Sequence, residues 1–156
     1  ALIDVWSVDG GGYYDMQTSS EMRARAKFRS DEAGRYWFWS IRPRHYPIPT
    51  DGPVGAMLEA MGRHCYRPAH MHLAVRAEGY VPLTTQLFDA QSEFLDSDAV
   101  FGVRDSLIVE FQKHAPGAAA DGRALSVPYY TVDFDLRLAP EKPRRSLAAA
   151  QRAELA

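Results

Sequence analysis

Several features that define other classes of protein are missing from this sequence. The single cysteine, Cys65, cannot form an intrachain disulfide or a thiolate metal cluster, as is typical of a reducing compartment. No run approaches the about 18–20 apolar residues that cross a bilayer, and the chain opens without a charged leader segment. We therefore expect a cytoplasmic protein that neither spans a membrane nor is visibly secreted.

An excess of charge of one sign is also missing. Eighteen Lys and Arg residues stand against 20 Asp and Glu residues, which gives a net charge of −2 at pH 7. Binding to a phosphate backbone depends on a surplus of cations. The charge balance therefore predicts no nucleic-acid partner.

The length and the apolar content indicate one folded unit. A chain of 156 residues suits a single domain, and 46% hydrophobic residues supply an ample core. We place the domain at residues 1–139 and treat residues 140–156, which are basic and then Ala-rich, as a C-terminal tail. Because a strand-like run begins at Ala1 without an initiator Met, we expect further residues upstream.

Alternation with a period of two predicts strands in most of the chain. Residues 22–29 alternate small or apolar side chains with cations, and the turn formers at 30–34 lead into an aromatic run at 35–41, so a hairpin is expected. Four prolines between 42 and 53 predict a rigid, irregular loop. Helical spacing predicts one short helix at 54–61, and further strands are expected at 69–76, 81–88, 107–113 and 128–138. The pattern indicates an all-β fold, an antiparallel β-sandwich with one short helix and long irregular loops.

The sharpest local signal is a pair of histidines two residues apart, His70 and His72. Residues at this spacing on a strand share a face, with Cα atoms about 6.5–7 Å apart, so both imidazoles could bind one metal ion. Such a pair is also often merely exposed or hydrogen-bonded. The residues alone leave the remaining ligands open: candidates are Tyr14, Tyr46, Glu78, Glu93, Glu110, His45, His64 and His114.

Several short strings, taken together, resemble one enzyme family. In order and spacing they are similar to the intradiol ring-cleavage dioxygenases, above all the catechol and hydroxyquinol 1,2-dioxygenases, from about Asp4 to Phe111. The strings are Asp4-Val5-Trp6 with Gly12-Tyr13-Tyr14-Asp15; Phe28-Arg29-Ser30-Asp31 with Gly34-Arg35-Tyr36; Tyr46-Pro47-Ile48-Pro49 with Asp51-Gly52-Pro53-Val54-Gly55; Gly62-Arg63-His64 with Arg67-Pro68-Ala69-His70-Met71-His72; and Leu83-Thr84-Thr85-Gln86.

This resemblance implies a mononuclear, non-haem Fe(III) ion. The implied ligands are Tyr14, Tyr46, His70 and His72, with Tyr14 preferred to Tyr13 because the family's ligand precedes an Asp. Phenolate oxygen is a hard donor that suits trivalent iron, and imidazole suits iron in general. The resemblance further implies intradiol cleavage of a catechol or hydroxyquinol by O2 to a muconate- or maleylacetate-type diacid, and a homodimer for the full-length protein.

Roles for other residues also come from the resemblance. Arg67 would stabilise charge on the ring and help to bind substrate, and Gln86 would add a supporting hydrogen bond. Ile48, Ala99 and Val100 would form the wall of the substrate pocket. The ordinary interpretations are a surface salt bridge for Arg67, a strand residue for Gln86 and core packing for the other three.

Two other functions stay open at this point. The scaffold could be a non-catalytic β-sandwich module that binds a partner through the aromatic residues 36–39. Alternatively, His70 and His72 could hold a divalent metal together with a carboxylate.

Overall fold

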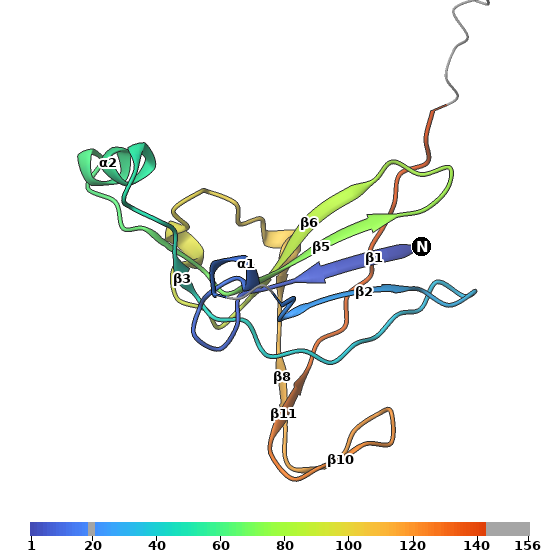
Figure 1. The fold of residues 1–156 in the computed structure, drawn as a ribbon. Coiled ribbons are helices and arrows are strands. Elements are labelled where there is room, and N and C mark those ends of the chain that lie inside the picture. Colours follow the sequence, from blue (N-terminus) through green and yellow to red (C-terminus); the bar gives the residue numbers. More distant parts are fainter. Residues whose placement is uncertain (19–20, 143–156) are drawn as a thin grey trace, which may run out of the picture.

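A five-stranded sheet forms the centre of the computed structural model, which describes residues 1–18 and 21–142 (Figure 1). Neighbouring strands are antiparallel, except for β6 and β7, which run parallel. In the order of the sheet, the strands are β2 (Arg25–Arg29), β1 (Leu2–Trp6), β5 (His70–Arg76), β6 (Leu83–Asp89) and β7 (Ile108–Val109).

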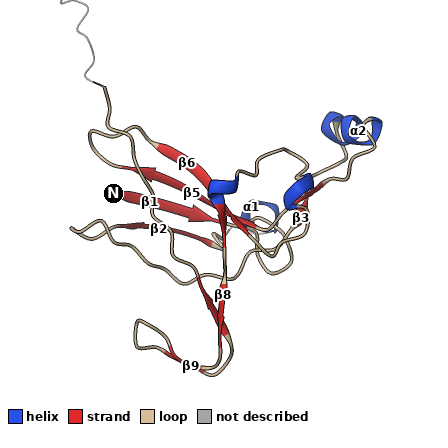
Figure 2. Ribbon diagram, turned by 180° about the vertical axis from the view of Figure 1, so that it is seen from behind, coloured by secondary structure: helices blue, strands red, loops and turns tan. Residues whose placement is uncertain are grey.

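Short ladders and helices occupy the long connections (Figure 2). The ladders pair β3 (Tyr46–Pro47) with β4 (Tyr66–Arg67), β8 (Gln112–His114) with β11 (Tyr129–Thr131), and β9 (Gly117–Ala118) with β10 (Ala124–Leu125). The helices are α1 (Asp15–Thr18), α2 (Pro53–Ala60) and the 3-10 turns η1 (Leu95–Ser97) and η2 (Asp105–Leu107).

The core lies on one face of the large sheet. Alternate residues of its strands, together with Phe111, form a buried cluster: Ile3, Val5, Met71, Leu73, Val75, Leu87, Val109 and Phe111. Aromatic and aliphatic side chains from β11 and from two irregular segments cover it, namely Tyr36, Phe38, Tyr130, Phe134, Leu136 and Leu138. Figures 1 and 2 show the segment after β11 crossing the sheet. The predicted all-β sandwich fold is confirmed, with α1 as a second, one-turn helix.

The predicted hairpin between residues 22–29 and 35–41 is wrong. The chain does reverse at Gly34, whose φ is +80°, but β2 pairs with β1 and residues 35–41 form no strand. Tyr36 and Phe38 instead pack on Phe28, with ring centroids 6.5 and 5.3 Å away, and on the core. Side-chain packing, rather than a backbone ladder, therefore holds the aromatic run.

The other strand predictions hold in part. Strands β5 and β6 match the predicted ranges closely, and β2 begins only at Arg25 because Ala24 has a φ of +50°. The predicted strand at 107–113 is divided between β7 and β8, and that at 128–138 is a ladder only over Tyr129–Thr131. Beyond β11, every second residue is still apolar, but these side chains (Phe134, Leu136 and Leu138) pack on the core without forming a strand.

Helix α2 lies at one end of the molecule, away from the large sheet (Figure 1). It confirms the helix predicted at 54–61, although only Leu58 of the predicted apolar stripe is buried. A Cβ on Gly55 would overlap the Thr50 carbonyl, so the turn before the helix requires glycine there. The whole excursion is closed at its base, where the Ile48 amide donates to the Cys65 carbonyl at 2.9 Å.

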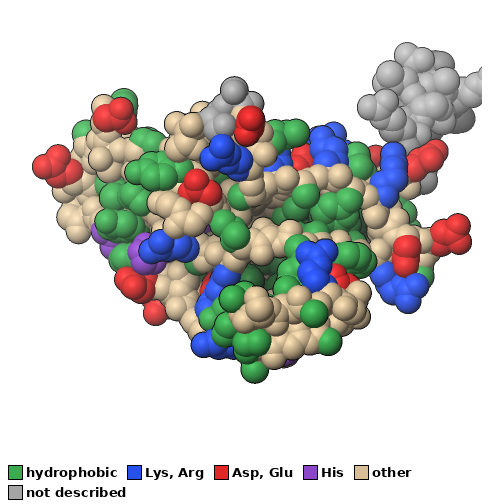
Figure 3. Space-filling view, turned by 60° about the horizontal axis from the view of Figure 1, so that its bottom comes forward, with side chains coloured by type: hydrophobic (Ala, Val, Ile, Leu, Met, Phe, Trp, Pro, Cys, Tyr) green, Lys and Arg blue, Asp and Glu red, His purple; other side chains and the backbone are tan. Residues whose placement is uncertain are grey.

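Charges of both signs are interspersed on the face that Figure 3 shows. Among the helices of the described residues, none has the length and apolar character needed to cross a membrane.

Candidate metal centre

The predicted site residues come from three places that the fold brings together. Tyr46 in β3 lies directly opposite Arg67 in β4, and β5 begins three residues later with His70. Tyr14 precedes α1 in the loop that follows β1. His70 and His72 share one face of β5, as their spacing predicted, while Met71 and Leu73 point to the core.

Four donor atoms from these segments converge. The Tyr14 hydroxyl lies 2.9 Å from the Tyr46 hydroxyl and 2.9 Å from His72 Nε2. His70 Nε2 lies 3.1 Å from His72 Nε2, and the Tyr46 ring packs against His70 at 5.5 Å between centroids. Two phenols and two imidazoles from distant parts of the chain therefore meet around one point.

Hydrogen bonding leaves the imidazoles ready to act as ligands. His70 Nδ1 donates to the Pro68 carbonyl at 2.7 Å, which leaves the lone pair on Nε2 facing the cluster. Burial, and then the charge of Arg67, lowers the pKa of His70 to about 3 and that of His72 to about 4. Both rings are therefore neutral at pH 7, the form in which imidazole binds metals.

The phenols complete the donor set. Burial, followed by the hydrogen bond with Tyr46, raises the pKa of Tyr14 far above its usual value despite the charge of Arg67, so this hydroxyl keeps its proton unless a metal ion binds it. Two hard oxygens and two imidazole nitrogens are a donor set that fits a trivalent iron ion. Within residues 1–18 and 21–142, no group of three or more His, Cys, Asp or Glu residues is placed to hold a metal. The alternative of two histidines with a carboxylate therefore gains no support.

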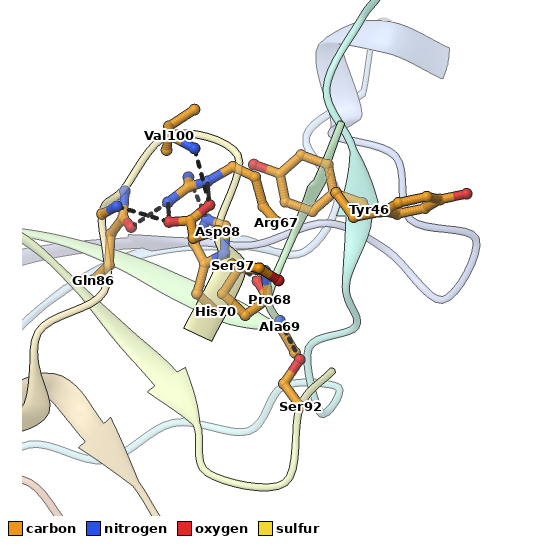
Figure 4. A network of polar contacts seen from close by, with 12 residues as sticks. Tyr46, Arg67, Pro68, Ala69, His70, Gln86, Ser92, Ser97, Asp98 and Val100 are labelled. Atoms are coloured by element: carbon orange, nitrogen blue, oxygen red, sulfur yellow. Dashed lines mark hydrogen bonds and ion pairs between the residues drawn. The ribbon is translucent and has the colours of Figure 1, made fainter. Parts of the chain in front are cut away.

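A buried cation stands beside this cluster (Figure 4). Arg67 is 5% exposed, and its Nη1 lies 3.1 Å from His70 Nε2. Its Nη2 donates to Gln86 Oε1 at 2.9 Å, while Nε and Nη2 donate to the two oxygens of Asp98 at 3.1 and 3.2 Å. The ion pair of Arg67 is thus buried, unlike the surface salt bridge of the ordinary interpretation.

Asp98 is a site residue that sequence reasoning missed. It is 3% exposed and also accepts the Gly102 amide at 2.8 Å. In the sequence it stands in Asp96-Ser97-Asp98, which has the composition of an exposed turn. Its side-chain partner, Arg67, lies 31 residues earlier in the chain, and no local pattern carries that pairing.

Comparisons with known proteins agree with this geometry. A family model described as Dioxygenase matches residues 1–140. The chain is 45% identical over 143 residues to a hydroxyquinol 1,2-dioxygenase from Rhizobium sp. (strain MTP-10005), covering 89% of this chain and 48% of that protein. The chain belongs to the intradiol ring-cleavage dioxygenase family. A catechol 1,2-dioxygenase from Candida albicans is 36% identical over 156 residues, or 98% of this chain and 50% of that protein.

Solved structures of the same family share the fold. A hydroxyquinol 1,2-dioxygenase from Pseudomonas putida DLL-E4 superposes with a TM-score of 0.81 at 39% identity, covering 90% of this chain and 50% of that chain. A catechol 1,2-dioxygenase from Pseudomonas arvilla C-1 gives a TM-score of 0.82 at 34% identity, covering 95% and 48%. The chain spans about half the length of the curated relatives it matches.

The residues predicted to form the pocket wall are less closely grouped. Ala99 is 6% exposed and Val100 is 47% exposed, both in the loop that carries Asp98. Ile48 is half-buried just after β3. A cavity of about 430 Å³ lies beside Trp6, and none of these three residues lines it. Their role in binding substrate stays a prediction.

Proposed function

We propose that this chain is the iron-binding catalytic part of an enzyme that cleaves a catechol-type diol between its two hydroxylated carbons. The convergence of the Tyr14, Tyr46, His70 and His72 donor atoms, in a member of this family, carries the proposal. The relatives named hydroxyquinol 1,2-dioxygenase favour a diol with a further hydroxyl group. Both atoms of O2 enter the muconate- or maleylacetate-type product as two carboxyl groups are formed, so no external reductant is needed.

Those four residues would hold the ferric ion. When bound, the ion would make the ring of a coordinated diol electron-rich enough to react with O2. As ligands of the ion Tyr14 and Tyr46 would be phenolates, and either phenolate oxygen could then accept a proton from an incoming diol hydroxyl. Moving this proton to a phenol oxygen favours binding of the diol as its anion.

Arg67 supplies fixed positive charge next to the ligands. Burial alone would lower the pKa of its guanidinium, but the hydrogen bonds and the charge of Asp98 raise it above the usual value, so Arg67 stays protonated. Asp98 and Gln86 hold its orientation from two sides. A preorganised cation aimed at charge that develops on the ring is worth several kcal/mol in a dry site, typically about 3 or 4.

Further parts of the proposal concern the protein as a whole. Residues 1–139 would form the catalytic unit, which agrees with a family match that ends at 140. In the structure, the Glu141 amide still donates to the Gly79 carbonyl at 2.8 Å, so the last described residues stay attached to the sheet. Homodimerisation of the full-length protein and a cytoplasmic location stay predictions.

The test is spectroscopic as well as catalytic. The ferric-loaded chain is expected to be red-brown from tyrosinate-to-iron charge transfer, to change colour when hydroxyquinol or catechol is added, and to consume O2 in equal amount to the diol. Tyr46→Phe should weaken the band and the activity, whereas Tyr80→Phe, at an exposed turn remote from the cluster, should leave both unchanged. A colourless protein at full iron occupancy would overturn the proposal.

A further inference from the structure

A row of four side chains crosses the large sheet at the end nearest the metal centre. Arg25 on β2 lies opposite Trp6 on β1, Trp6 lies opposite His72 on β5, and His72 lies opposite Gln86 on β6. Directly opposed residues in adjacent strands share a face. This row lies on the face opposite the core, because its neighbour Val5 belongs to the buried cluster. Two of its members, Trp6 and Arg25, have no assigned role.

Trp6 and Arg25 belong to a closed ring of contacts that begins and ends at His72. The Trp6 ring stacks on the His72 imidazole, with centroids 4.8 Å apart and planes 2° from parallel. The Arg25 guanidinium carbon lies over the Trp6 ring, 5.4 Å from its centroid, and Arg25 Nε lies 3.2 Å from Asp15 Oδ2. Asp15 follows Tyr14, whose hydroxyl returns to His72 Nε2 at 2.9 Å. This ring of contacts thus joins the proposed ligands His72 and Tyr14 through the side chains of Trp6, Arg25 and Asp15.

The two histidines are held in different ways. A histidine that binds a metal through one nitrogen almost always donates the other N–H to an oxygen, which fixes the plane of the ring. His70 does so through the Pro68 carbonyl. His72 Nδ1 has no protein hydrogen-bond partner among the described residues, and its ring plane is set by the Trp6 stack instead. Rotation of the His72 ring would therefore cost the stacking contact with Trp6 as well as the 2.9 Å contact of Nε2 with the Tyr14 hydroxyl.

We propose that Trp6, Arg25 and Asp15 are positioning residues for the metal centre. Trp6 fixes the plane of the His72 imidazole, and the pair of Arg25 with Asp15 ties that plane to the segment that carries Tyr14. The proposal rests on the proposed function, because it concerns residues that would hold the ferric ion. Arg25 and Asp15 form a half-buried ion pair on the Trp6 side of His72, whereas the direct contact of Arg67 is with His70.

Retention of iron by the loaded chain tests this proposal separately from turnover. Ferric-loaded variants are titrated with a chelator while the charge-transfer band is followed, and the unfolding of the metal-free chain is measured in parallel. Trp6→Leu should release iron at about 10-fold lower chelator concentration, the size of effect that outer residues have on metal affinity. Trp6→Phe, which restores a stacking ring, should recover most of that loss. Trp37→Leu, at a Trp that is 68% exposed, should behave as the wild type.

Asp15→Asn gives a second measurement that does not depend on the Trp6 variants folding. Loss of the ion pair should weaken iron retention by about 2- to 5-fold, with Asp31→Asn, at an exposed ion pair with Arg35, as the matched control. Iron retention by Trp6→Leu and Asp15→Asn equal to that of the wild type would overturn the proposal alone. A wild-type chain that takes up no ferric ion would overturn the proposed function, and this inference with it.

Discussion

Removing the carboxylate of Asp98 should destabilise the protein far more than its position in a turn suggests. Asp98 and Arg67 are 3% and 5% exposed, and two hydrogen bonds of 3.1 and 3.2 Å join them. In Asp98→Ala the guanidinium stays buried, since Arg67 is also held by Gln86 and lies against His70. The variant therefore leaves a desolvated charge without its counterion.

The size of the effect follows from this burial. Breaking a buried ion pair by removing one partner costs about 3–5 kcal/mol. For a domain of this size, each kcal/mol lowers the melting temperature by about 2–4 °C, so Asp98→Ala should melt roughly 6–20 °C lower. Asp98→Asn keeps the shape and can still accept the Gly102 amide, so it should lose less, about 1.5–3 kcal/mol.

The difference between wild type and Asp98→Asn should also depend on pH. Burial alone would raise the pKa of Asp98, but the hydrogen bonds from Arg67 and from the Gly102 amide outweigh burial and hold it below its ordinary value. A carboxyl whose folded pKa is lowered stabilises the fold fully above its unfolded pKa of about 3.9. That stabilisation is lost as the pH falls through the folded value. The gap should be complete at neutral pH and should close below about pH 4.

Thermal unfolding followed by circular dichroism, on metal-free protein at neutral pH and through the acid range, measures both effects. Asp31→Asn is the matched control, because its ion pair with Arg35 is exposed and should change the melting temperature little. An Asp98→Ala variant that melts within about 2 °C of the wild type at neutral pH would refute the reasoning, because the predicted loss is several-fold larger. A gap for Asp98→Asn that persists unchanged in acid would refute the assignment of the effect to the ionised carboxylate.

Three backbone substitutions give further tests by thermal unfolding. Gly55→Ala should destabilise α2 by at least about 1 kcal/mol despite the higher helix propensity of Ala, since the new Cβ overlaps the Thr50 carbonyl; an unchanged melting temperature would contradict this. Gly102→Ala would place a Cβ 2.8 Å from Arg67 Nη2, so we expect a loss of about 1–3 kcal/mol and slower oxygen uptake, and normal turnover would be the contrary result. Ala24→Gly should be neutral or slightly stabilising, because φ is +50° there and the left-handed region costs a non-glycine residue about 1–2 kcal/mol; a clear destabilisation would show the opposite.

The sequence signals for the candidate metal centre are partly local and partly carried by a family pattern. The spacing of His70 and His72 alone places both rings on one face of a strand, and the structure shows them there. The phenols are different. From the residues alone, Tyr14 and Tyr46 are candidate metal ligands beside several carboxylates, and only the family resemblance selects them. Their convergence depends on how β3 and the loop after β1 meet β5, which no periodicity encodes.

The errors have one physical origin, since they concern long-range packing. The aromatic run at 35–41 has strand composition, but its rings contribute more by packing on the core than its backbone would by pairing with β2. Long-range packing also explains why the sequence gives no role to Asp98 and Trp6. The fold of the loop after η1 makes Asp98 the buried counterion of Arg67. The register of β1 with β5 stacks the Trp6 ring on His72.

The closure of the α2 excursion at its base has a consequence for how this architecture can diversify. Residues 49–62 leave and rejoin the chain at neighbouring points, where Ile48 pairs with Cys65, so their length can change without shifting Tyr46 against Arg67. Doubling such a loop costs only about 0.6 kcal/mol of closure entropy. By contrast, one residue inserted between Arg67 and His72 would turn the His72 ring to the face of the hydrophobic core. Insertions and new binding loops should therefore be engineered into the α2 excursion, and the strand pairs at its base should be left unchanged.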